Sequence, residues 1–246
     1  MSPLFNENIC HLTYTHSSYS DLWPIYFAQM KKYFSVGMDH HVAVENSDVL
    51  LPKEVTPVVY KDSDAYSERL ISVLEKLEGY ELVFFDHEDM FLYAEPDYLE
   101  LTKYFYYLHS GSLDYIRLIK GGNCEFQTLA ECRSLHEFDM QSEWIFSIQP
   151  SFWRRTSLIE LITLCPKSSI WELEVRGQDI IRRIRARCAF SHRSGIKRGL
   201  FHFDNDVYPY IATSIVKGKW NLSEYSQELS TLLNKYRIDP TIRGVR

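Results

Sequence analysis

Four ionisable side chains, Asp86, His87, Glu88 and Asp89, follow directly on the apolar stretch YELVFF at residues 80–85. Three carboxylates so close together repel one another, and each needs either open water or a counter-charge. A surface turn would supply water. A bound divalent cation would supply charge, and the cluster would then be a metal site. We interpret His87, which stands between the acids, as orienting or incidental and not as a ligand.

Strand and helix patterns alternate over residues 9–121. Strands are expected at 8–16, 40–46, 56–60, 80–85 and 114–122, and helices at 20–34, 62–79 and 96–111. This alternation predicts an α/β protein with a mostly parallel central sheet flanked by helices, Rossmann-like in its N-terminal half. Ligands of such sheets bind outside the carboxyl ends of the strands. Because the acidic cluster follows a strand, its placement favours a site over a simple turn.

The second half of the chain has less regular patterns. We expect a strand, a turn at Pro150 and a helix within 143–165, then a loop entering a basic helix within 168–188. Strand and loop patterns mix over 201–220, and a weak helix over 223–236 has Ser223 as its expected cap. No repeat or low-complexity linker divides the chain, so a single domain is expected.

The composition is that of a globular protein kept in a reducing compartment. The 246 residues are 45% apolar and 24% charged, which suffices for one large core. The five cysteines form no CxxC pair and are odd in number, which predicts a cytoplasmic protein. The first residues lack a basic start before a long apolar core, so no signal peptide is expected. No stretch approaches the roughly 18 apolar residues of a membrane span.

Charge is unevenly distributed along the chain. Residues 176–199 hold eight Lys or Arg and one acid, a net charge of +7 within a chain whose total is −6, which leaves −13 for the remainder. A local basic segment on an acidic body indicates a specific anionic partner and argues against general nucleic-acid binding. A solvated helix face is the alternative. An anionic acceptor, or an anionic membrane surface that carries a lipid-linked acceptor, would use the segment as a peripheral contact.

Four motifs occur in order: the acidic cluster, SIQPSFW at 147–153, SSIWELE at 168–174 and YPYIATSIVKGKW at 208–220. Together they resemble GT-A-type glycosyltransferases over roughly residues 9–220, in particular small sugar transferases of bacterial surface-glycan clusters and large viruses. The resemblance implies a GT-A-like domain with a nucleotide-sugar-binding half (9–121), an acceptor and catalytic half (122–220) and a tail (221–246). It implies a hexosyl- or deoxyhexosyltransferase that uses a nucleoside-diphosphate sugar, UDP being the commonest nucleotide, and a glycan or glycolipid acceptor.

The donor and its metal ion have expected ligands under this resemblance. A developing negative charge on the diphosphate needs Mn²⁺ or Mg²⁺, which prefers carboxylate and phosphate oxygens. The chain departs from a strict D-x-D motif, so the ligand assignment stays open among Asp86, Glu88 and Asp89. The remaining donor-binding residues expected are Thr13, Tyr14, Thr15 and His16 at the end of the first strand, with Arg69, His202 and Lys217.

The acceptor and the catalytic base are expected from the second half. Inverting transfer needs a general base, and in the resembling proteins a carboxylate at the start of a late helix has this role. Glu172 is favoured because the ring of Trp171 would form an apolar wall and raise its pKa, and Glu174 is the alternative. Gln149, Phe152, Trp153 and Trp171 are the expected acceptor contacts.

Two other classes of function stay open. A nucleotidyltransferase acting on a sugar phosphate is also an α/β protein with acids at strand ends, but the N-terminal region has no Gly-rich phosphate loop. A non-catalytic module could hold a glycan through its aromatic rings, which make up 15% of the residues. The products released from a nucleotide substrate distinguish the three.

Overall fold

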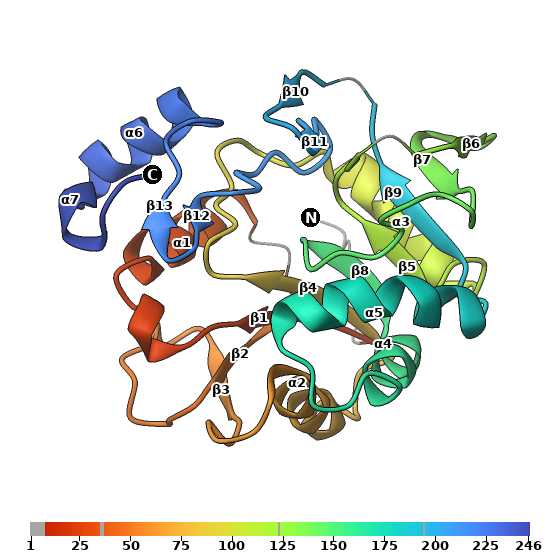
Figure 1. Cartoon of the computed structure of the whole chain (residues 1–246), viewed down its shortest axis with the longest axis horizontal. Coiled ribbons are helices and arrows are strands. Elements are labelled where there is room, and N and C mark those ends of the chain that lie inside the picture. Colours follow the sequence, from red (N-terminus) through yellow and green to blue (C-terminus); the bar gives the residue numbers. More distant parts are fainter. Residues whose placement is uncertain (1–7, 35–36, 123, 194) are drawn as a thin grey trace.

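The computed structural model describes residues 8–246 except 35, 36, 123 and 194, and the statements below concern these residues. The main sheet has nine strands, flanked by helices (Figure 1). Its strands are β1 Ile9–Tyr14, β2 Asp39–Val44, β3 Thr56–Val59, β4 Leu82–His87, β5 Tyr115–Arg117, β6 Phe126–Leu129, β7 Cys132–Phe138, β8 Ser151–Arg154 and β9 Cys188–Ser191. Two short pairs add β10 Lys197–Arg198 with β11 His202–Phe203, and β12 Ile215–Val216 with β13 Lys219–Trp220.

The predicted α/β class is confirmed, and the sheet is mixed. The strand order is β3-β2-β1-β4-β8-β5-β9-β7-β6. Pairing is parallel from β3 to β4, as expected, but β8 runs antiparallel to both of its neighbours. Two reversals leave β5 running in the direction of β4, so the carboxyl ends of β1, β4 and β5 share one edge of the sheet. Register places Asp86 beside Thr13 and His87 beside Tyr14 at that edge.

Helices cover both faces of the sheet. They are α1 Trp23–Tyr33, α2 Tyr66–Lys76, α3 Tyr98–His109, α4 Arg155–Thr163, α5 Ile170–Arg183, α6 Ser226–Tyr236 and α7 Pro240–Arg243, with a 3-10 turn η1 at Ser17–Tyr19. One buried core joins α1, α3 and α6 through residues such as Ile25, Leu101 and Leu229. The other joins α2, α4 and α5 through Leu70, Leu158 and Leu173.

Two predicted boundaries in the second half are wrong. In the 143–165 segment the strand follows Pro150 instead of preceding it, because β8 must insert between β4 and β5. Ser223 does not cap α6, which begins at Ser226 with Tyr225 at the N-cap position and no side-chain cap. The Ser223 hydroxyl instead donates to Oδ1 of Asn221 at 2.5 Å.

The C-terminal tail returns to the carboxyl edge of the sheet. Leu229, Leu232 and Leu233 of α6 belong to the same core as α1. Beyond α7, the chain lies along β13, where the Trp220 amide donates to the Gly244 carbonyl at 3.0 Å and the Arg246 amide to the Trp220 carbonyl at 2.9 Å. Figure 1 shows α6 and α7 on the side of the molecule that also holds α1 and the β12–β13 pair.

Gly177 is where α5 approaches the segment before β8 most closely. A Cβ at this position would overlap the ring of Phe146, which is buried. Gly-to-Ala changes usually stabilise a helix by about 1 kcal/mol, but overpacking costs about 1–3 kcal/mol. We expect Gly177→Ala to lower the free energy of unfolding in a urea titration. Gly79→Ala is the matched control, because nothing lies within 4 Å of its Cβ; equal midpoints for both variants would contradict the packing argument.

Candidate functional site

Asp86 lies at the end of β4 as predicted, but its carboxylate is bonded inside the protein. The Tyr26 hydroxyl donates to Oδ2 at 2.7 Å, and the Thr13 hydroxyl donates to Oδ1 at 2.9 Å. Nε2 of His11 lies 3.0 Å from Oδ1, and Asp86 is 1% exposed. A carboxylate with three internal partners has little capacity left for a ligand. This geometry makes Asp86 a buried anchor between β1, α1 and β4.

Glu88 and Asp89 form a different environment immediately after the strand. Glu88 is buried, and its Oε2 has no hydrogen-bond partner among the described residues. Burial and then the charge of Asp89 raise the pKa of Glu88 well above its ordinary value. Burial raises the pKa of Asp89 to about 6. Two adjacent carboxylates that are this poorly solvated are stabilised as anions by a nearby cation.

The acidic pair fits a cation that shares its ligands with a substrate. Among the residues the structure describes, no three His, Cys, Asp or Glu side chains converge to hold a metal ion. Mg²⁺ commonly takes only one or two protein carboxylates and completes its shell with phosphate oxygens and water. The orphaned Oε2 of Glu88 and the adjacent carboxylate of Asp89 are suitable donors for such an ion.

Arg243 of α7 is a charged residue at this edge that the sequence reasoning missed. Its charge lowers the pKa of both Glu88 and Asp89, opposing the effect of burial. Its guanidinium is held by Asp21 and by the carbonyls of Gly218 (3.3 Å) and Ser18 (3.2 Å). No pattern in the tail relates position 243 to positions 86–89, so only the packing of the tail reveals this effect of the Arg243 charge.

Glu172 serves the start of α5. The Ser169 amide donates to its Oε2 at 2.8 Å, and the Glu172 amide donates to Oγ of Ser169 at 3.3 Å, which completes a capping box. The Ser169 amide, and then the Ser169 hydroxyl that also donates to Oε2 at 2.7 Å, lower the pKa of Glu172. The expected apolar wall is wrong, because the side chain of Trp171 is 70% exposed. Neither residue has the environment that was predicted for it.

Glu174 points the other way, toward the carboxyl edge. The Ile148 amide donates to its Oε1 at 2.6 Å, and burial raises the pKa of this carboxyl. Burial is the main cause that raises the pKa of Tyr66, and the charges of Tyr14, Glu174 and Glu88 raise it further; the Tyr66 hydroxyl lies 2.9 Å from Nε2 of His87. Ile148, which bonds Glu174, lies three residues before Ser151, and Ser151 pairs with Phe85 just before the acidic cluster, so the two halves of the chain meet at this edge.

The end of β1 holds part of the expected donor set. The hydroxyls of Thr13 and Thr15 are used internally, by Asp86 and by the Trp23 indole (2.8 Å) respectively. Tyr14 stacks on Tyr60 with ring centroids 5.1 Å apart. This packing disfavours the expectation that a threonine hydroxyl reads the nucleotide base.

His16 and Arg69 meet at the same end of β1. Nε2 of His16 lies 3.5 Å from Asp62, and Arg69 forms an ion pair with Asp62 at 3.0 Å. The Arg69 guanidinium also lies over the Tyr60 ring at 5.2 Å. A hollow of about 640 Å³ begins at Ser17, the residue after His16, and is lined by the β1–α1 loop, the first half of α1 and residues 49–52; neither His16 nor Arg69 lines it.

The expected acceptor residues separate into two groups. Phe152 and Trp153 are wrong as ligand contacts, because β8 is central in the sheet and both are fully buried. Gln149 lies at the carboxyl edge of the sheet and accepts from the Tyr210 hydroxyl at 2.7 Å.

Arg117 is a second buried charged residue that the sequence did not indicate. It is 1% exposed and donates to the Trp144 carbonyl (2.7 Å) and the Ser147 hydroxyl (3.2 Å). It fixes the segment that leads into Gln149.

His202 and Lys217, both expected to bind the donor, lie in different parts of the structure. His202 stacks on Tyr225 with centroids 5.8 Å apart, and the charges that act on its pKa come from Glu224, Asp204 and Arg198, not from the acidic cluster. Lys217 is exposed in the β12–β13 turn, where it and Gly218 have φ of 51° and 75°. The Gly218 carbonyl accepts from Arg243, whose charge acts on the acidic pair, so Lys217 is adjacent in sequence to a partner of Arg243.

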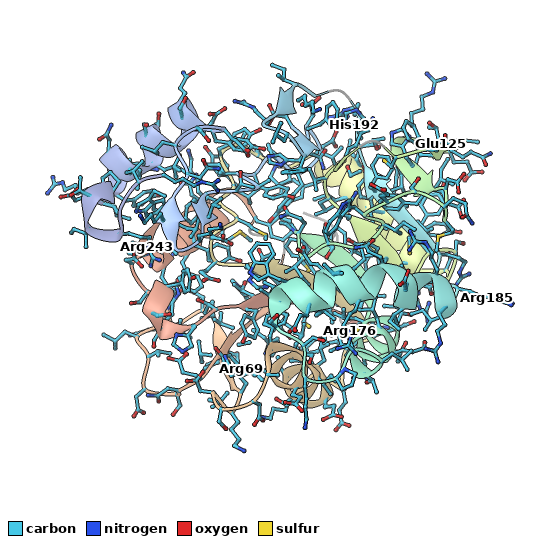
Figure 2. All side chains as sticks on the ribbon, viewed as in Figure 1. Arg69, Glu125, Arg176, Arg185, His192 and Arg243 are labelled. Atoms are coloured by element: carbon cyan, nitrogen blue, oxygen red, sulfur yellow. The ribbon has the colours of Figure 1, made fainter. Side chains whose placement is uncertain are left out.

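The basic segment 176–199 does not form one charged face. Figure 2 labels Arg176 on α5 and Arg185 just beyond the end of that helix. Five of the eight cations in the segment have internal partners: Arg176 with Ser168, Arg182 with the Met140 and Ser142 carbonyls, Arg187 with Asp114, Arg193 with Asp97, and Arg198 with Asp204 and Glu228. In the described part of the chain, no helix has the length and apolar character needed to cross a membrane.

Comparison with known proteins finds only distant similarities, and these are to solved structures. No protein-family model and no curated protein sequence matches the chain. One similar solved structure is CMP:2-keto-3-deoxy-manno-octonic acid synthetase complexed with CTP (TM-score 0.46, 10% identity, covering 76% of this chain and 89% of that one). Another is 4-diphosphocytidyl-2C-methyl-D-erythritol synthase from Anaerococcus prevotii (0.48, 8%, 85% and 92%). At these scores the likeness identifies neither an activity nor a substrate.

Proposed function

We propose that the chain is a divalent-metal-dependent, inverting glycosyltransferase that moves a sugar from a nucleoside-diphosphate donor to a hydroxyl of a glycan or glycolipid. One observation carries the proposal. The Glu174 carboxylate accepts from the Ile148 amide just before β8, and the acidic pair Glu88–Asp89 follows the end of β4, where Phe85 pairs with Ser151 at the start of β8. A transferase of this kind needs one carboxylate as base and others for the cation, and the site provides both.

Charged residues would bind the diphosphate of the donor, and a separate hollow would bind its nucleoside. Glu88 and Asp89 would hold Mn²⁺ or Mg²⁺ together with the diphosphate, and the ion would stabilise the charge that develops on the leaving group. Arg243 is the cation whose charge acts at that position, and Lys217 precedes its partner Gly218. The hollow that begins at Ser17, lined by Trp23, Phe27 and residues 49–52, is large enough to take the nucleoside.

The acceptor hydroxyl loses its proton to Glu174. A carboxyl whose pKa is raised by burial is a stronger base than an exposed one, and general-base catalysis improves as the pKa approaches the working pH. Gln149, which follows the Ile148 amide bonded to Glu174 and accepts from the Tyr210 hydroxyl, is an uncharged group that can bind sugar hydroxyls. The proton moves to the Glu174 carboxylate as the new glycosidic bond forms and the nucleoside diphosphate leaves.

The products of a nucleotide-sugar assay test this proposal. With UDP-sugars and Mn²⁺ the protein is expected to release a nucleoside diphosphate, slowly to water and faster with an acceptor glycan. A nucleotidyltransferase would instead release pyrophosphate from a nucleoside triphosphate and a sugar phosphate. The β1–α1 loop, residues 15–22, contains no Lys or Arg to hold a triphosphate, which argues against that activity. Pyrophosphate release, or binding without turnover, would overturn the proposal.

A further inference from the structure

The C-terminal tail, residues 240–246, is bonded along β13 (Figure 1). The residues that flank the β12–β13 pair, Ser214 and Asn221, bond each other, with the Asn221 amide donating to the Ser214 carbonyl at 2.8 Å. Ser214 is fully buried, and its hydroxyl donates to the Asp89 carbonyl. The β12–β13 pair therefore connects the tail with the backbone of the acidic pair.

Arg243 of this tail extends to the β1–α1 loop and binds it at several points. Its Nε donates to Oδ2 of Asp21 at 2.8 Å, and its Nη2 donates to Oδ1 of the same carboxylate and to the Ser18 carbonyl at 3.2 Å. Its Nη1 donates to the Gly218 carbonyl at 3.3 Å, and the guanidinium lies 4.8 Å from the centre of the Tyr19 ring. Because the Arg243 side chain is only 13% exposed, its two-bond pair with Asp21 is held more firmly than an ordinary surface ion pair.

The loop that Arg243 binds forms one wall of the proposed nucleoside hollow. Ser17 and Ser20 of the loop line this hollow of about 640 Å³, together with the first half of α1. In the described structure, the polar contacts that join Ser18 and Asp21 to residues outside the loop are those made by Arg243. The position of this wall therefore depends on a residue that lies 222 positions after Asp21 in the sequence.

We propose that Arg243 is a positioning residue for the nucleoside, holding residues 18–21 so that this wall of the hollow is in place before the nucleotide binds. The inference rests on the proposed function, which assigns the nucleoside to that hollow. A wall that is already ordered does not have to be immobilised on binding, so more of the contact energy appears as affinity. The planar guanidinium supplies several donors in a fixed geometry, which the compact ammonium of a lysine does not reproduce. Residues 240–246 thereby form part of the nucleotide site.

Two variants separate the bonds of Arg243 from its charge. Burial raises the pKa of Glu88 and of Asp89, and the Arg243 charge lowers both, so a change that removes the charge would disturb the acidic pair as well. Arg243→Lys keeps the charge and loses the two-bond pair with Asp21. Asp21→Ala keeps Arg243 and removes its carboxylate partner. Arg246→Gln is the matched control, because this side chain is exposed in the same tail and its amide still bonds along β13.

Amide hydrogen exchange of the full chain, without any nucleotide, measures whether the tail holds the loop. The hydrogen-bonded amides within residues 19–22 should exchange about tenfold or more faster in Arg243→Lys and in Asp21→Ala than in the parent, because the loop opens more often. Amides of β4 should keep their parental rates, since a local opening leaves the rest of the fold intact. Arg246→Gln should match the parent in both regions.

Calorimetric titration with UDP, CDP, GDP and ADP in Mn²⁺ measures the effect on nucleotide binding. For the nucleotide that the parent binds best, Arg243→Lys and Asp21→Ala should each lower the affinity about tenfold or more, because the wall must then be ordered on binding. Arg246→Gln should stay within about twofold of the parent, as exposed substitutions usually do. In turnover, the donor KM of the first two variants should rise while kcat stays within about threefold, whereas a general loss of fold lowers activity without this split.

The positioning role is overturned if Arg243→Lys and Asp21→Ala bind that nucleotide as the parent does, if the loop amides keep their parental exchange rates, or if Arg246→Gln loses binding equally. A parent that binds none of the four nucleotides overturns the proposed function, and the positioning role with it. The exchange measurement uses no nucleotide, so it still decides whether the tail holds the loop, and the two failures are distinguishable.

Discussion

Glu174→Gln is expected to lower kcat by about 10²–10⁴-fold, the usual contribution of a general base, with little change in donor affinity. Gln keeps the size of the side chain and can still accept from the Ile148 amide, so the segment before β8 stays in place. It cannot take the proton of the acceptor hydroxyl. Steady-state kinetics with a saturating acceptor, together with calorimetric donor binding, measure the two effects separately.

Glu172→Gln is the matched control, two residues away on the same helix. Glu172 caps α5 through Ser169 and is exposed, so its loss should leave turnover near that of the parent. A dead Glu172→Gln enzyme with an active Glu174→Gln enzyme would falsify the assignment. Loss of donor binding in Glu174→Gln would also contradict it, because Glu174 would then act on the donor.

The raised pKa of Glu174 gives this prediction a pH dependence. The base must be ionised, so activity falls with acid, and the fall begins above the ordinary glutamate pKa because burial raises the pKa. The folded protein binds this proton more tightly than the unfolded chain does. Ionisation of Glu174 therefore lowers stability as pH rises through its pKa. Thermal unfolding of Glu174→Gln at neutral pH should occur at the same temperature as in the parent or higher.

The choice between the two glutamates shows what the sequence could and could not supply. The pattern of a serine followed three residues later by a glutamate, Ser169 and Glu172, is a capping-box signature and was readable before the structure. Given that role, the second carboxylate was the better base. The wall proposed for Trp171 could not be tested from sequence, because an aromatic at a helix start can face either the core or solvent.

Local patterns predicted the elements better than they predicted how the elements meet. The strand that ends at the acidic cluster and the two flanking helices were expected from periodicity and are present. The reversed β8 was not, because pairing direction depends on contacts between distant segments, and its central position buries Phe152 and Trp153. Arg243 is 154 positions after Asp89 in sequence, and only the packing of the tail on β13 brings it to the site.

Single substitutions of the three acids in the cluster are expected to have two different effects: loss of metal-dependent donor binding at Glu88 and Asp89, and loss of stability at Asp86. Glu88→Gln and Asp89→Asn should each weaken donor binding in Mn²⁺ by about 100-fold or more, since each removes a ligand of the shared cation. Neither change should destabilise the fold, because Oε2 of Glu88 has no partner to lose. Isothermal calorimetry with and without a chelator measures the metal-dependent part of binding.

Asp86→Asn should instead act on stability. Its carboxylate accepts from Tyr26 and Thr13 and lies 3.0 Å from Nε2 of His11, and an amide at this buried position turns a donor toward groups that are themselves donors. The free energy of unfolding should fall by about 2–4 kcal/mol. In whatever fraction stays folded, donor binding should keep its dependence on Mn²⁺. If Asp86→Asn folds as the parent does and loses only metal-dependent binding, while Glu88→Gln and Asp89→Asn bind normally, then Asp86 holds the cation and the assignment of the acidic pair is wrong.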